Sequence, residues 1–430
     1  MGVVFSLGRM GIAMKVCWMK AGGLVPLDFG GRIRSFQMVK ALASRHSVTV
    51  LTFYPEVSHD QHSAVGHLFD ELILVPLKMP NRRSISELMD YVRCLGAEHP
   101  YSMEKYYRPE LHRAVTDLFS RKSFDVIVCD FVYPAGVLNW FTKTPIVLFT
   151  HNVEAEVWER QYKVASNLLW KLIFRREYRG LARAEKRYAS LSAHILAVSE
   201  SNRQFFASCA GGIENVTLVP TGVDTDYFHP APNEERGNQL VFTGAMDWAP
   251  NHDAMVWFCR DILPRIRSSA PEVETWIVGR NPSSSLRELV AGDDRVHITG
   301  RVDDIRPYMN RASLFVLPMR TGSGTRLKVF EAMAAGKAVV STPTGAEGLP
   351  VRDGQNILLA STAEEFASRV VHLLEDTSCR RQLGKSAREL AEGGYNWKVA
   401  ADHLEAALQR VVRKSCLEIA VPSSNLCSQE

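Results

Sequence analysis

The hydrophobic residues of this chain follow two alternating patterns, short continuous apolar runs and longer stretches with helical spacing. In the first half the short runs predict buried strands at Lys15–Met19, Val48–Phe53, Leu72–Val75, Asp125–Cys129, Ile146–Phe149, His194–Val198 and Val216–Val219. The helical spacing predicts helices at Arg32–Ser44, Ile85–Leu95, Glu110–Arg121 and one long helix from Glu154 to about Leu191. Such alternation is typical of a parallel sheet with helices on both faces.

The same alternation restarts after a segment rich in proline and polar residues, which marks a linker at residues 225–238. Further strands are predicted at Leu240–Thr243, Thr275–Val278, Val296–Thr299, Leu314–Leu317, Ala338–Ser341 and Asn356–Leu359. Further helices are predicted at Asp253–Ser268, Val302–Asn310, Arg326–Ala335, Ala363–Leu374, Ser378–Glu392 and Trp397–Arg413. The predicted fold class is therefore α/β, with two tandem Rossmann-like, doubly wound domains that face each other across a cleft.

A length of 430 residues suits two domains better than one. The predicted divisions are an N-terminal domain at 14–224, the linker, a C-terminal domain at 239–395, a final helix at 396–414 and a tail at 415–430 that we expect to be disordered. Residues 1–13 lack the basic segment that opens a signal peptide, and Met14 begins the first strand. We therefore expect Met14 to be the natural start, which is a hypothesis.

Charge and cysteine content narrow the class of protein. A net charge of +4 does not call for a nucleic-acid partner, and we predict none. The eight cysteines are scattered without a CxxC pair, which argues against a zinc site and a disulfide framework and favours the reducing cytoplasm. No apolar run reaches about 18 residues, so no membrane-spanning helix is predicted.

The segment from Met319 to Thr342 carries the clearest candidate chemistry. Glycines at 322 and 324 allow close approach of a ligand to the backbone, and the loop leads directly into a helix whose N-terminus suits a phosphate. Arg326 and Lys328 add positive charge there, and Glu331 follows on the same face, where it can accept hydrogen bonds from sugar hydroxyls. The segment predicts a sugar-nucleotide site. The alternative is an ordinary strand–helix turn with a solvated ion pair, and the patterns GxxxxGK[ST] and GxGxxG are absent.

Ligands of such folds bind beyond the carboxyl ends of the strands, which directs attention to three further residues. His151 follows the strand Ile146–Phe149 and is either a core histidine or a functional one, and its position favours function. Asp130 follows another strand and either lines the same site or caps a helix. Glu347 either contacts donor phosphate or sugar, or caps a turn.

Four motifs in this order resemble those of family 4 glycosyltransferases with the GT-B fold: Thr150–Glu154, Phe242–Asp253, the block from Gly324 to Gly336, and Gly345–Leu349. The resemblance extends from Met14 to about Arg413 and is closest to sugar transferases of bacterial exopolysaccharide systems. It implies transfer of a sugar from a nucleotide-diphosphate sugar to a glycan or lipid-linked acceptor in polysaccharide biosynthesis. It also implies retention of configuration, no metal and no cofactor beyond the donor.

The resemblance also assigns roles to individual residues. It makes the first domain the acceptor side and the second the nucleotide-sugar side, with Glu331 on the ribose and His151 near the donor sugar. The implied catalytic residues are His151, Arg326 and Lys328. The implied donor-binding residues are Gly322, Ser323, Gly324, Thr325, Glu331, Glu347 and the backbone near Arg301 and Val302, which receives the base. A glycine turn with its following cation, Gly30, Gly31 and Arg32, approaches the diphosphate and acceptor.

Two departures from the family pattern bear on these roles. Ser323 stands where an acid usually contacts the donor sugar, and the loop Gly244–Trp248 lacks the usual Arg and Lys. We infer that Arg326 and Lys328 take over neutralisation of the diphosphate. Asp224-Thr-Asp226 matches an Asp-x-Asp metal pattern, but it lies beside the linker and is interpreted as a turn, so no metal ligands are predicted.

Other readings remain open. A GT-B-like sugar-nucleotide epimerase and a non-catalytic sugar-nucleotide-binding protein are the alternatives in function. The basic, partly apolar segment Lys163–Arg187 either contacts an anionic membrane surface, which would make the protein peripheral to the inner membrane, or packs on its sheet with a solvated charged face. The second reading is favoured slightly.

Overall fold

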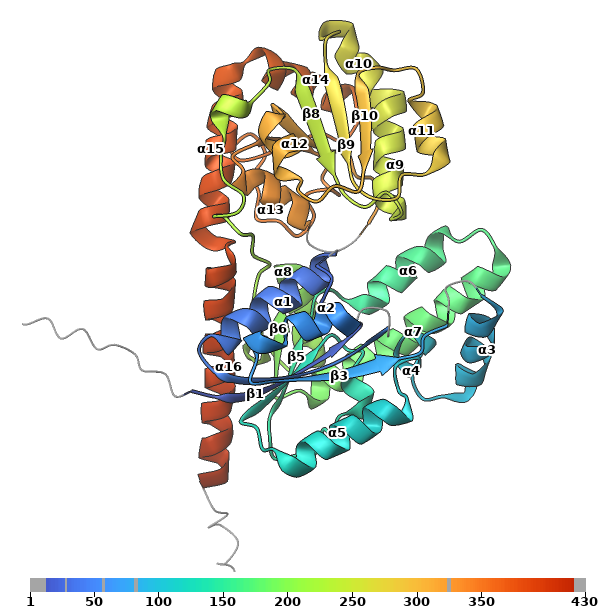
Figure 1. Ribbon diagram of the computed structural model, residues 1–430, viewed down its shortest axis with the longest axis vertical. Helices are drawn as coiled ribbons and strands as arrows, with labels where there is room; N and C mark the ends of the chain where they lie inside the picture. Colours follow the sequence, from blue (N-terminus) through green and yellow to red (C-terminus); the bar gives the residue numbers. More distant parts are fainter. Residues whose placement is uncertain (1–12, 28, 56–58, 81–83, 323–325, 421–430) are drawn as a thin grey trace, which may run out of the picture. The chain divides into compact units, whose positions relative to one another are not determined.

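The computed structural model describes residues 13–27, 29–55, 59–80, 84–322 and 326–420 and divides into two compact units (Figure 1). The first unit takes its described residues from Met1–Ala197, Asn202–Leu218 and Ala401–Glu430. The second unit takes its described residues from Val198–Ser201 and Val219–Ala400.

The first unit is built on a 7-stranded sheet in which all neighbours pair in parallel, in the order β3-β2-β1-β4-β5-β6-β7. The strands are β1 Lys15–Ala21, β2 Ser47–Pro55, β3 Glu71–Leu77, β4 Val126–Asp130, β5 Ile146–Phe149, β6 His194–Ala197 and β7 Val216–Leu218. Every strand predicted for this half is present. β1, β2, β4, β5 and β6 are apolar runs buried on both faces, whereas the edge strands β3 and β7 are only partly buried. This confirms a Rossmann-like first half.

The helices of this half, together with the helix that ends the described chain, are α1 Gly30–Ala43, α2 His59–Ala64, α3 Ile85–Arg93, α4 Tyr101–Glu104, α5 Pro109–Arg121, α6 Glu154–Val164, α7 Leu168–Leu191, α8 Glu200–Cys209 and α16 Trp397–Ala420. Buried residues of α5 and α7 share a core with Cys17 and Met19 of β1. In Figure 1, α1 lies on the opposite face of the sheet from α5.

Three predictions for these helices were wrong. The helix predicted from Glu154 to Leu191 is two helices, because Asn167 caps the start of α7 by accepting hydrogen bonds from the N–H groups of Leu169 and Trp170. Gly30 and Gly31, predicted as a turn, form the first turn of α1. The helix predicted to end at Arg413 continues to Ala420, six residues into the segment expected to be disordered.

Two buried glutamates on α7 hold the starts of other helices. Glu177 accepts hydrogen bonds from the N–H groups of Tyr101 and Ser102, in the first turn of α4. Glu185 accepts them from Glu154 and Ala155, in the first turn of α6, at 2.6 and 3.1 Å. Each carboxyl group accepts hydrogen bonds from amide groups that a helix N-terminus leaves without a helical partner.

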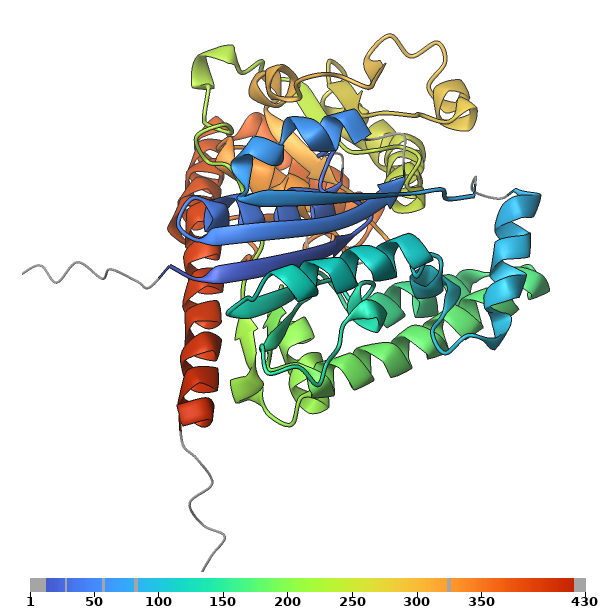
Figure 2. The same cartoon turned by 60° about the horizontal axis from the view of Figure 1, so that its bottom comes forward.

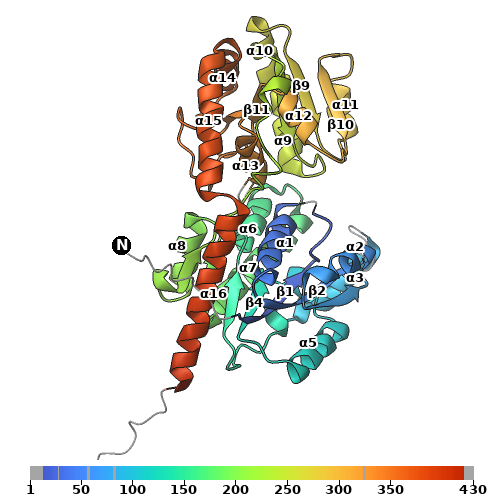
Figure 3. The same ribbon diagram turned by 60° about the vertical axis from the view of Figure 1, so that its left-hand side comes forward.

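The second unit contains a 6-stranded parallel sheet in the order β10-β9-β8-β11-β12-β13. The strands are β8 Gln239–Thr243, β9 Glu274–Val278, β10 Val296–Gly300, β11 Leu314–Leu317, β12 Ala338–Ser341 and β13 Leu358–Leu359. The helices are α9 Ala249–Trp257, α10 Leu263–Ser269, α11 Ser284–Leu289, α12 Arg306–Arg311, α13 Leu327–Ala334, α14 Ala363–Glu375 and α15 Thr377–Gly394. α14 and α15 lie side by side (Figure 3). The predicted tandem of two doubly wound sheets is confirmed.

Two helix predictions in this unit also needed correction. The helix predicted at Asp253–Ser268 begins earlier, at Ala249, and is interrupted by a π-helical turn at Phe258–Ile262, next to Pro264, whose ring nitrogen has no hydrogen to donate. The helix predicted from Val302 begins only at Arg306, where the Asp304 carboxylate accepts the backbone N–H of Arg306. Within the described residues, no helix combines the length and the apolar character needed to cross a membrane.

Candidate functional site

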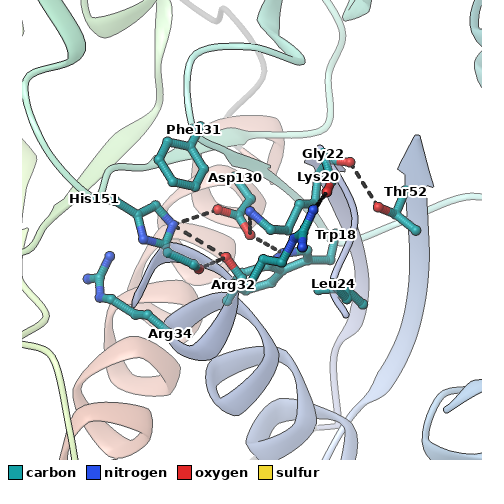
Figure 4. A network of polar contacts seen from close by, with 12 residues as sticks. Trp18, Lys20, Gly22, Leu24, Arg32, Arg34, Thr52, Asp130, Phe131 and His151 are labelled. Atoms are coloured by element: carbon teal, nitrogen blue, oxygen red, sulfur yellow. Dashed lines mark hydrogen bonds and ion pairs between the residues drawn. The ribbon is translucent and has the colours of Figure 1, made fainter. Parts of the chain in front are cut away.

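In the first unit, polar side chains from three neighbouring strands meet at the carboxyl edge of the sheet (Figure 4). Lys20 and Asp130 are register partners across β1 and β4, and both are buried. One Asp130 oxygen, Oδ2, accepts a hydrogen bond from Trp18 Nε1 at 2.9 Å and lies 3.7 Å from Lys20 Nζ. The other, Oδ1, lies 2.7 Å from Nε2 of His151, which follows β5. We call these four residues the Asp130 cluster.

The electrostatics of the Asp130 cluster fix the charge of its members. Burial opposes ionisation of Asp130, but Lys20 and His151 outweigh it and lower the Asp130 pKa to about 2. Burial lowers the pKa of His151 to about 3, against the attraction of Asp130. His151 is therefore neutral, and its Nε2–H donates to the ionised Asp130, which assigns the lone pair to Nδ1.

Aromatic packing sets the angle of the imidazole. The Phe131 ring stacks on His151 with 3.8 Å between centroids and 9° between planes. Phe131 has a φ of +68°, in the left-handed region that costs a non-glycine residue about 1–3 kcal/mol. A Cβ at Gly31 would lie 3.0 Å from Cζ of Phe131, so the first turn of α1 approaches the ring only because residue 31 has no side chain. The strained residue thus holds His151 against α1.

The structure brings part of the predicted Gly30-Gly31-Arg32 segment to His151. Ser35 bridges the two: its hydroxyl donates to the carbonyl oxygen of Gly31 at 2.8 Å and lies 3.4 Å from His151 Nε2. Arg32 is oriented differently, because its guanidinium donates to the carbonyl oxygen of Gly22 at 2.8 and 3.2 Å. Arg34, which was not predicted, is buried and donates to the carbonyl oxygen of Thr150 at 2.7 Å.

In the second unit, the N-terminus of α13 packs against the loop that follows β8. Lys328 Nζ donates to Asn251 Oδ1 at 2.8 Å, and Asn251 Nδ2 donates to the carbonyl oxygen of Ala245 at 2.8 Å. A Cβ at Gly244 would lie 2.5 Å from Lys328 Nζ. The loop that lacks the family's usual cations therefore makes room for this lysine. Gly244, Asn251, Arg326 and Lys328 form what we call the Lys328 cluster.

Arg326 stands immediately before α13 and is buried. Its guanidinium carbon lies 5.5 Å from the centre of the Trp248 ring, a cation–π distance. A Cβ at Gly322 would lie 2.7 Å from Arg326 Nη2 and 3.2 Å from Cη2 of Trp248. Gly322 thus lets the backbone pass beside the cation, and Ser323, Gly324 and Thr325 lie outside the described residues.

Two ionisable groups of α13 have pKa values close to neutral pH. Burial, with a smaller contribution from Arg326, lowers the pKa of Lys328 to about 7, while Glu331 opposes the change. Burial raises the pKa of Glu331 to about 7, against the attraction of Lys328. Both groups therefore change protonation readily when a charged ligand binds.

The remaining predicted donor residues lie on other loops of the same sheet edge. Arg301 and Val302 follow β10, which β9 and β8 separate from β11, so they lie roughly 14 Å along the edge from the strand that leads to α13. Glu347 is exposed in the turn after β12. That turn is tied to the loop after β11, because Thr342 Oγ1 donates to the carbonyl oxygen of Met319 and accepts from the N–H of Gly345.

Sequence reasoning missed Trp18, Lys20 and Asn251 as members of these clusters, and Trp248 as the aromatic neighbour of Arg326. Lys20 had a visible signal, since a lysine that continues an apolar strand needs a carboxylate on a neighbouring strand. Trp248 and Asn251 lie in the recognised motif Phe242–Asp253, but nothing in the sequence pairs them with residues beyond 325.

Two observations concern metals. Asp224 Oδ1 accepts the backbone N–H groups of Asp226 and Tyr227, which is the turn predicted for that Asp-x-Asp pattern. Among the described residues, one group could supply three ligand atoms close together: His372, Asp376 and Cys379, where α14 meets α15. None of them belongs to the Asp130 or Lys328 cluster.

Comparison with known families covers both units. Residues 30–227 match the model of Glycosyltransferase Family 4, and residues 237–376 match that of Glycosyl transferases group 1. The chain belongs to family 4 of the glycosyltransferases. The fold and family that the motifs predicted are confirmed.

Individual relatives of this glycosyltransferase are distant. A phosphatidyl-myo-inositol mannosyltransferase of Mycolicibacterium smegmatis is 29% identical over 226 residues, 50% of this chain and 57% of that protein. An uncharacterized 44.6 kDa protein from the cps region of Klebsiella pneumoniae is 20% identical over 387 residues, 87% of this chain and 94% of its own. The structure of sucrose-phosphate synthase from Thermosynechococcus elongatus superposes with a TM-score of 0.70 at 18% identity, covering 93% of this chain and 100% of that one. The match thus spans little more than half of the mannosyltransferase, whereas the whole fold is shared with the synthase.

Proposed function

We propose that this glycosyltransferase moves a sugar from a nucleotide-diphosphate sugar to a glycan or lipid-linked acceptor in polysaccharide biosynthesis, in the cytoplasm. Retention of configuration and independence of metal belong to the same proposal. The observation that carries it is the Lys328 cluster, in which two cations lie at a helix N-terminus beside Gly244, whose lack of a side chain leaves room for Lys328.

The chemistry of donor cleavage explains why these residues are suited to it. When the bond between sugar and diphosphate breaks, negative charge accumulates on the departing phosphate oxygens. Arg326 and Lys328, with the amide groups that open α13, are fixed sources of positive potential in a largely buried site, so they stabilise that charge without rearranging. Such donors typically contribute about 3–4 kcal/mol each to the barrier. A metal is not needed for this neutralisation.

The rest of the donor would extend along the same sheet edge. Glu331, one turn into α13, offers carboxylate oxygens to the ribose hydroxyls, and the backbone near Arg301 and Val302 would receive the base. The separation of roughly 14 Å between β10 and β11 suits an extended nucleotide rather than a compact one.

The Asp130 cluster supports the sugar and acceptor side of the proposal. A neutral His151 with an accepting Nδ1 can take a hydrogen bond from a sugar hydroxyl, and Asp130 holds its ring and tautomer. Attack of the acceptor from the face that the diphosphate leaves would give retention without a carboxylate nucleophile.

The mannosyltransferase and cps-region relatives favour a glycan or lipid-linked acceptor and leave the sugar open. A thermal-shift screen of nucleotide sugars, followed by assay of nucleoside diphosphate release with and without EDTA, tests the proposal. Release that EDTA does not affect supports it, while release that requires a metal contradicts the metal-free part.

Variants at two arginines sharpen this test. Arg326→Gln should lower turnover by roughly a hundredfold or more. Arg320→Gln is the matched control, because Arg320 lies in the same loop but is exposed and pairs with Asp253. Near-normal turnover in Arg326→Gln would refute the assignment. Binding without diphosphate release would point to a non-catalytic protein, and conversion of the sugar with the nucleotide still attached would point to an epimerase.

A further inference from the structure

The helix α3 is amphipathic in the reverse of the usual sense, with its apolar side facing solvent. Ile85, Leu88, Met89 and Val92 are all exposed, Ile85 to 79%, and their spacing places them on one face. The buried residue is Asp90, which pairs with Arg108 and lies 3.5 Å from the Tyr101 hydroxyl. A helix with a buried acid and an exposed apolar stripe is not explained by packing within this unit.

A second exposed apolar surface lies where α6 ends and α7 begins. Val164, Leu168, Leu169 and Leu172 are exposed, Leu168 to 73%, and so is nearly half of Trp170. The two surfaces adjoin, because Arg176 of α7 donates hydrogen bonds to the carbonyl oxygens of Cys94 and Leu95, at the end of α3. Figures 1 and 2 both show α3 beside the N-terminal half of α7.

Along α7 from its N-terminus, the exposed side chains change from apolar to basic. Its exposed cations recur every three or four residues on one face, at Lys171, Arg175, Arg179, Arg183 and Lys186. None of these five forms an ion pair with another residue that the structure describes. The only acids of α7, Glu177 and Glu185, are buried against other helices, so its outer face carries positive charge alone.

We propose that the apolar faces of α3 and of the start of α7 insert into an anionic lipid surface, while the α7 cations contact its headgroups. Exposed aliphatic side chains with an aromatic residue beside a run of unpaired cations are what an anionic bilayer surface selects. The charge favours this occupant over a second copy of the chain, in which two such cation rows would repel each other. The inference deepens the proposed function by placing a lipid-linked acceptor within reach, and rests on it only in that respect.

Co-sedimentation with vesicles tests the surface without any enzyme assay. The full chain should bind vesicles of equal parts phosphatidylcholine and phosphatidylglycerol, bind phosphatidylcholine vesicles far less, and lose binding as salt rises. Leu88→Gln with Met89→Gln and Val92→Gln should weaken binding at least about tenfold. Lys171→Gln with Arg175→Gln and Arg179→Gln should weaken it about a hundredfold and remove the preference for anionic lipid. Phe141→Gln with Ile213→Gln, two exposed apolar residues outside α3 and α7, should change nothing.

A native reporter gives a second measurement. Brominated anionic lipid should quench part of the tryptophan fluorescence, and Trp170→Phe should remove that part while vesicle binding persists. Wild-type protein that ignores anionic vesicles, or variants of both faces that bind as wild type does, would overturn the proposal. So would self-association that the α3 variant abolishes, without vesicle binding. Donor hydrolysis in solution should be unchanged in the α3 variant, so loss of hydrolysis in a chain that still binds vesicles would count against the proposed function alone.

Discussion

Oδ1 of Asp130 lies 2.7 Å from Nε2 of His151, and the two residues come from strands that are neighbours in the sheet but 21 residues apart in sequence. The carboxylate also holds Lys20 and Trp18 in place, so one buried acid orients three other side chains. Its removal should therefore affect stability and turnover by separate routes.

Asp130→Asn should lower the free energy of unfolding by about 3–5 kcal/mol, because Lys20 loses the charge that compensates its burial. Turnover should fall on the order of a hundredfold or more, because an amide that donates to His151 favours the wrong tautomer. Urea unfolding and the diphosphate-release assay measure the two effects. Adding Lys20→Met should restore much of the stability but not the turnover. Recovery of both would show that Asp130 acts only through folding.

The depressed pKa of His151 predicts a dependence of stability on pH. The folded protein keeps His151 neutral down to about pH 3, whereas the unfolded chain protonates it near 6.5. Unfolding therefore takes up a proton in this window, and the free energy of unfolding should fall as pH drops from about 6.5 towards 3. His151→Gln should flatten part of that slope in urea titrations. His194→Gln is the comparison variant. Burial lowers the His194 pKa only to about 4, so the contribution of His194 to the slope should end near pH 4, whereas that of His151 continues towards pH 3.

Donor binding should take up protons near neutral pH. Lys328 has a pKa of about 7 and becomes fully charged when a diphosphate lies beside it, because an anion favours the protonated amine. Affinity for a nucleoside diphosphate should thus decline as pH rises above about 7. Calorimetry in two buffers of different ionisation enthalpy measures the uptake. Lys328→Met should remove most of the uptake, and Glu331→Gln should remove a smaller part, because Glu331 also has a pKa of about 7 but offers its oxygens to the ribose rather than the diphosphate. Equal heats in both buffers for the wild type would contradict this role.

Gly244→Ala should damage donor binding through a steric conflict. The new methyl group would lie 2.5 Å from Lys328 Nζ and 2.6 Å from Asn251 Nδ2, so the lysine must leave its partner. We expect a loss of about 1–3 kcal/mol in stability and roughly tenfold weaker nucleotide binding. Gly292→Ala is the control, because Gly292 also has a positive φ but open space around it. Equal effects of the two substitutions would mean that backbone strain alone is responsible.

The sequence was informative where a local pattern decides the structure. Continuous apolar runs predicted the strands because both faces of a parallel sheet are buried. The break between α6 and α7 was not predicted, because Ala165–Asn167 contains neither proline nor glycine. The Asn167 side chain caps α7 only once the chain has turned there, so its role as a cap cannot be seen in the sequence. The outward apolar face of α3 has the same periodicity as an inward one, so only the structure shows which way it points.

The candidate site divides in the same way. Arg326, Lys328 and Glu331 were proposed together because they are close in sequence. The Asp130 cluster as a unit was not, because Lys20 and Asp130 are 110 residues apart and meet only through the pairing of β1 with β4. Asp130 was noted at a strand end as a residue that could line the same site as His151, yet Trp18 and Lys20 were not foreseen.

The two glutamates of α7 give that helix a mechanical role. Glu185 accepts hydrogen bonds from the N–H groups of residues 154 and 155, which lie three and four positions after His151. Glu177, about two helical turns before Glu185 on α7, accepts hydrogen bonds from the N–H groups that begin α4. A force applied to the outer face of α7 would therefore be transmitted as a rigid displacement to the backbone beside the imidazole. In this chain a movement of α7 would therefore change the position of the backbone next to His151.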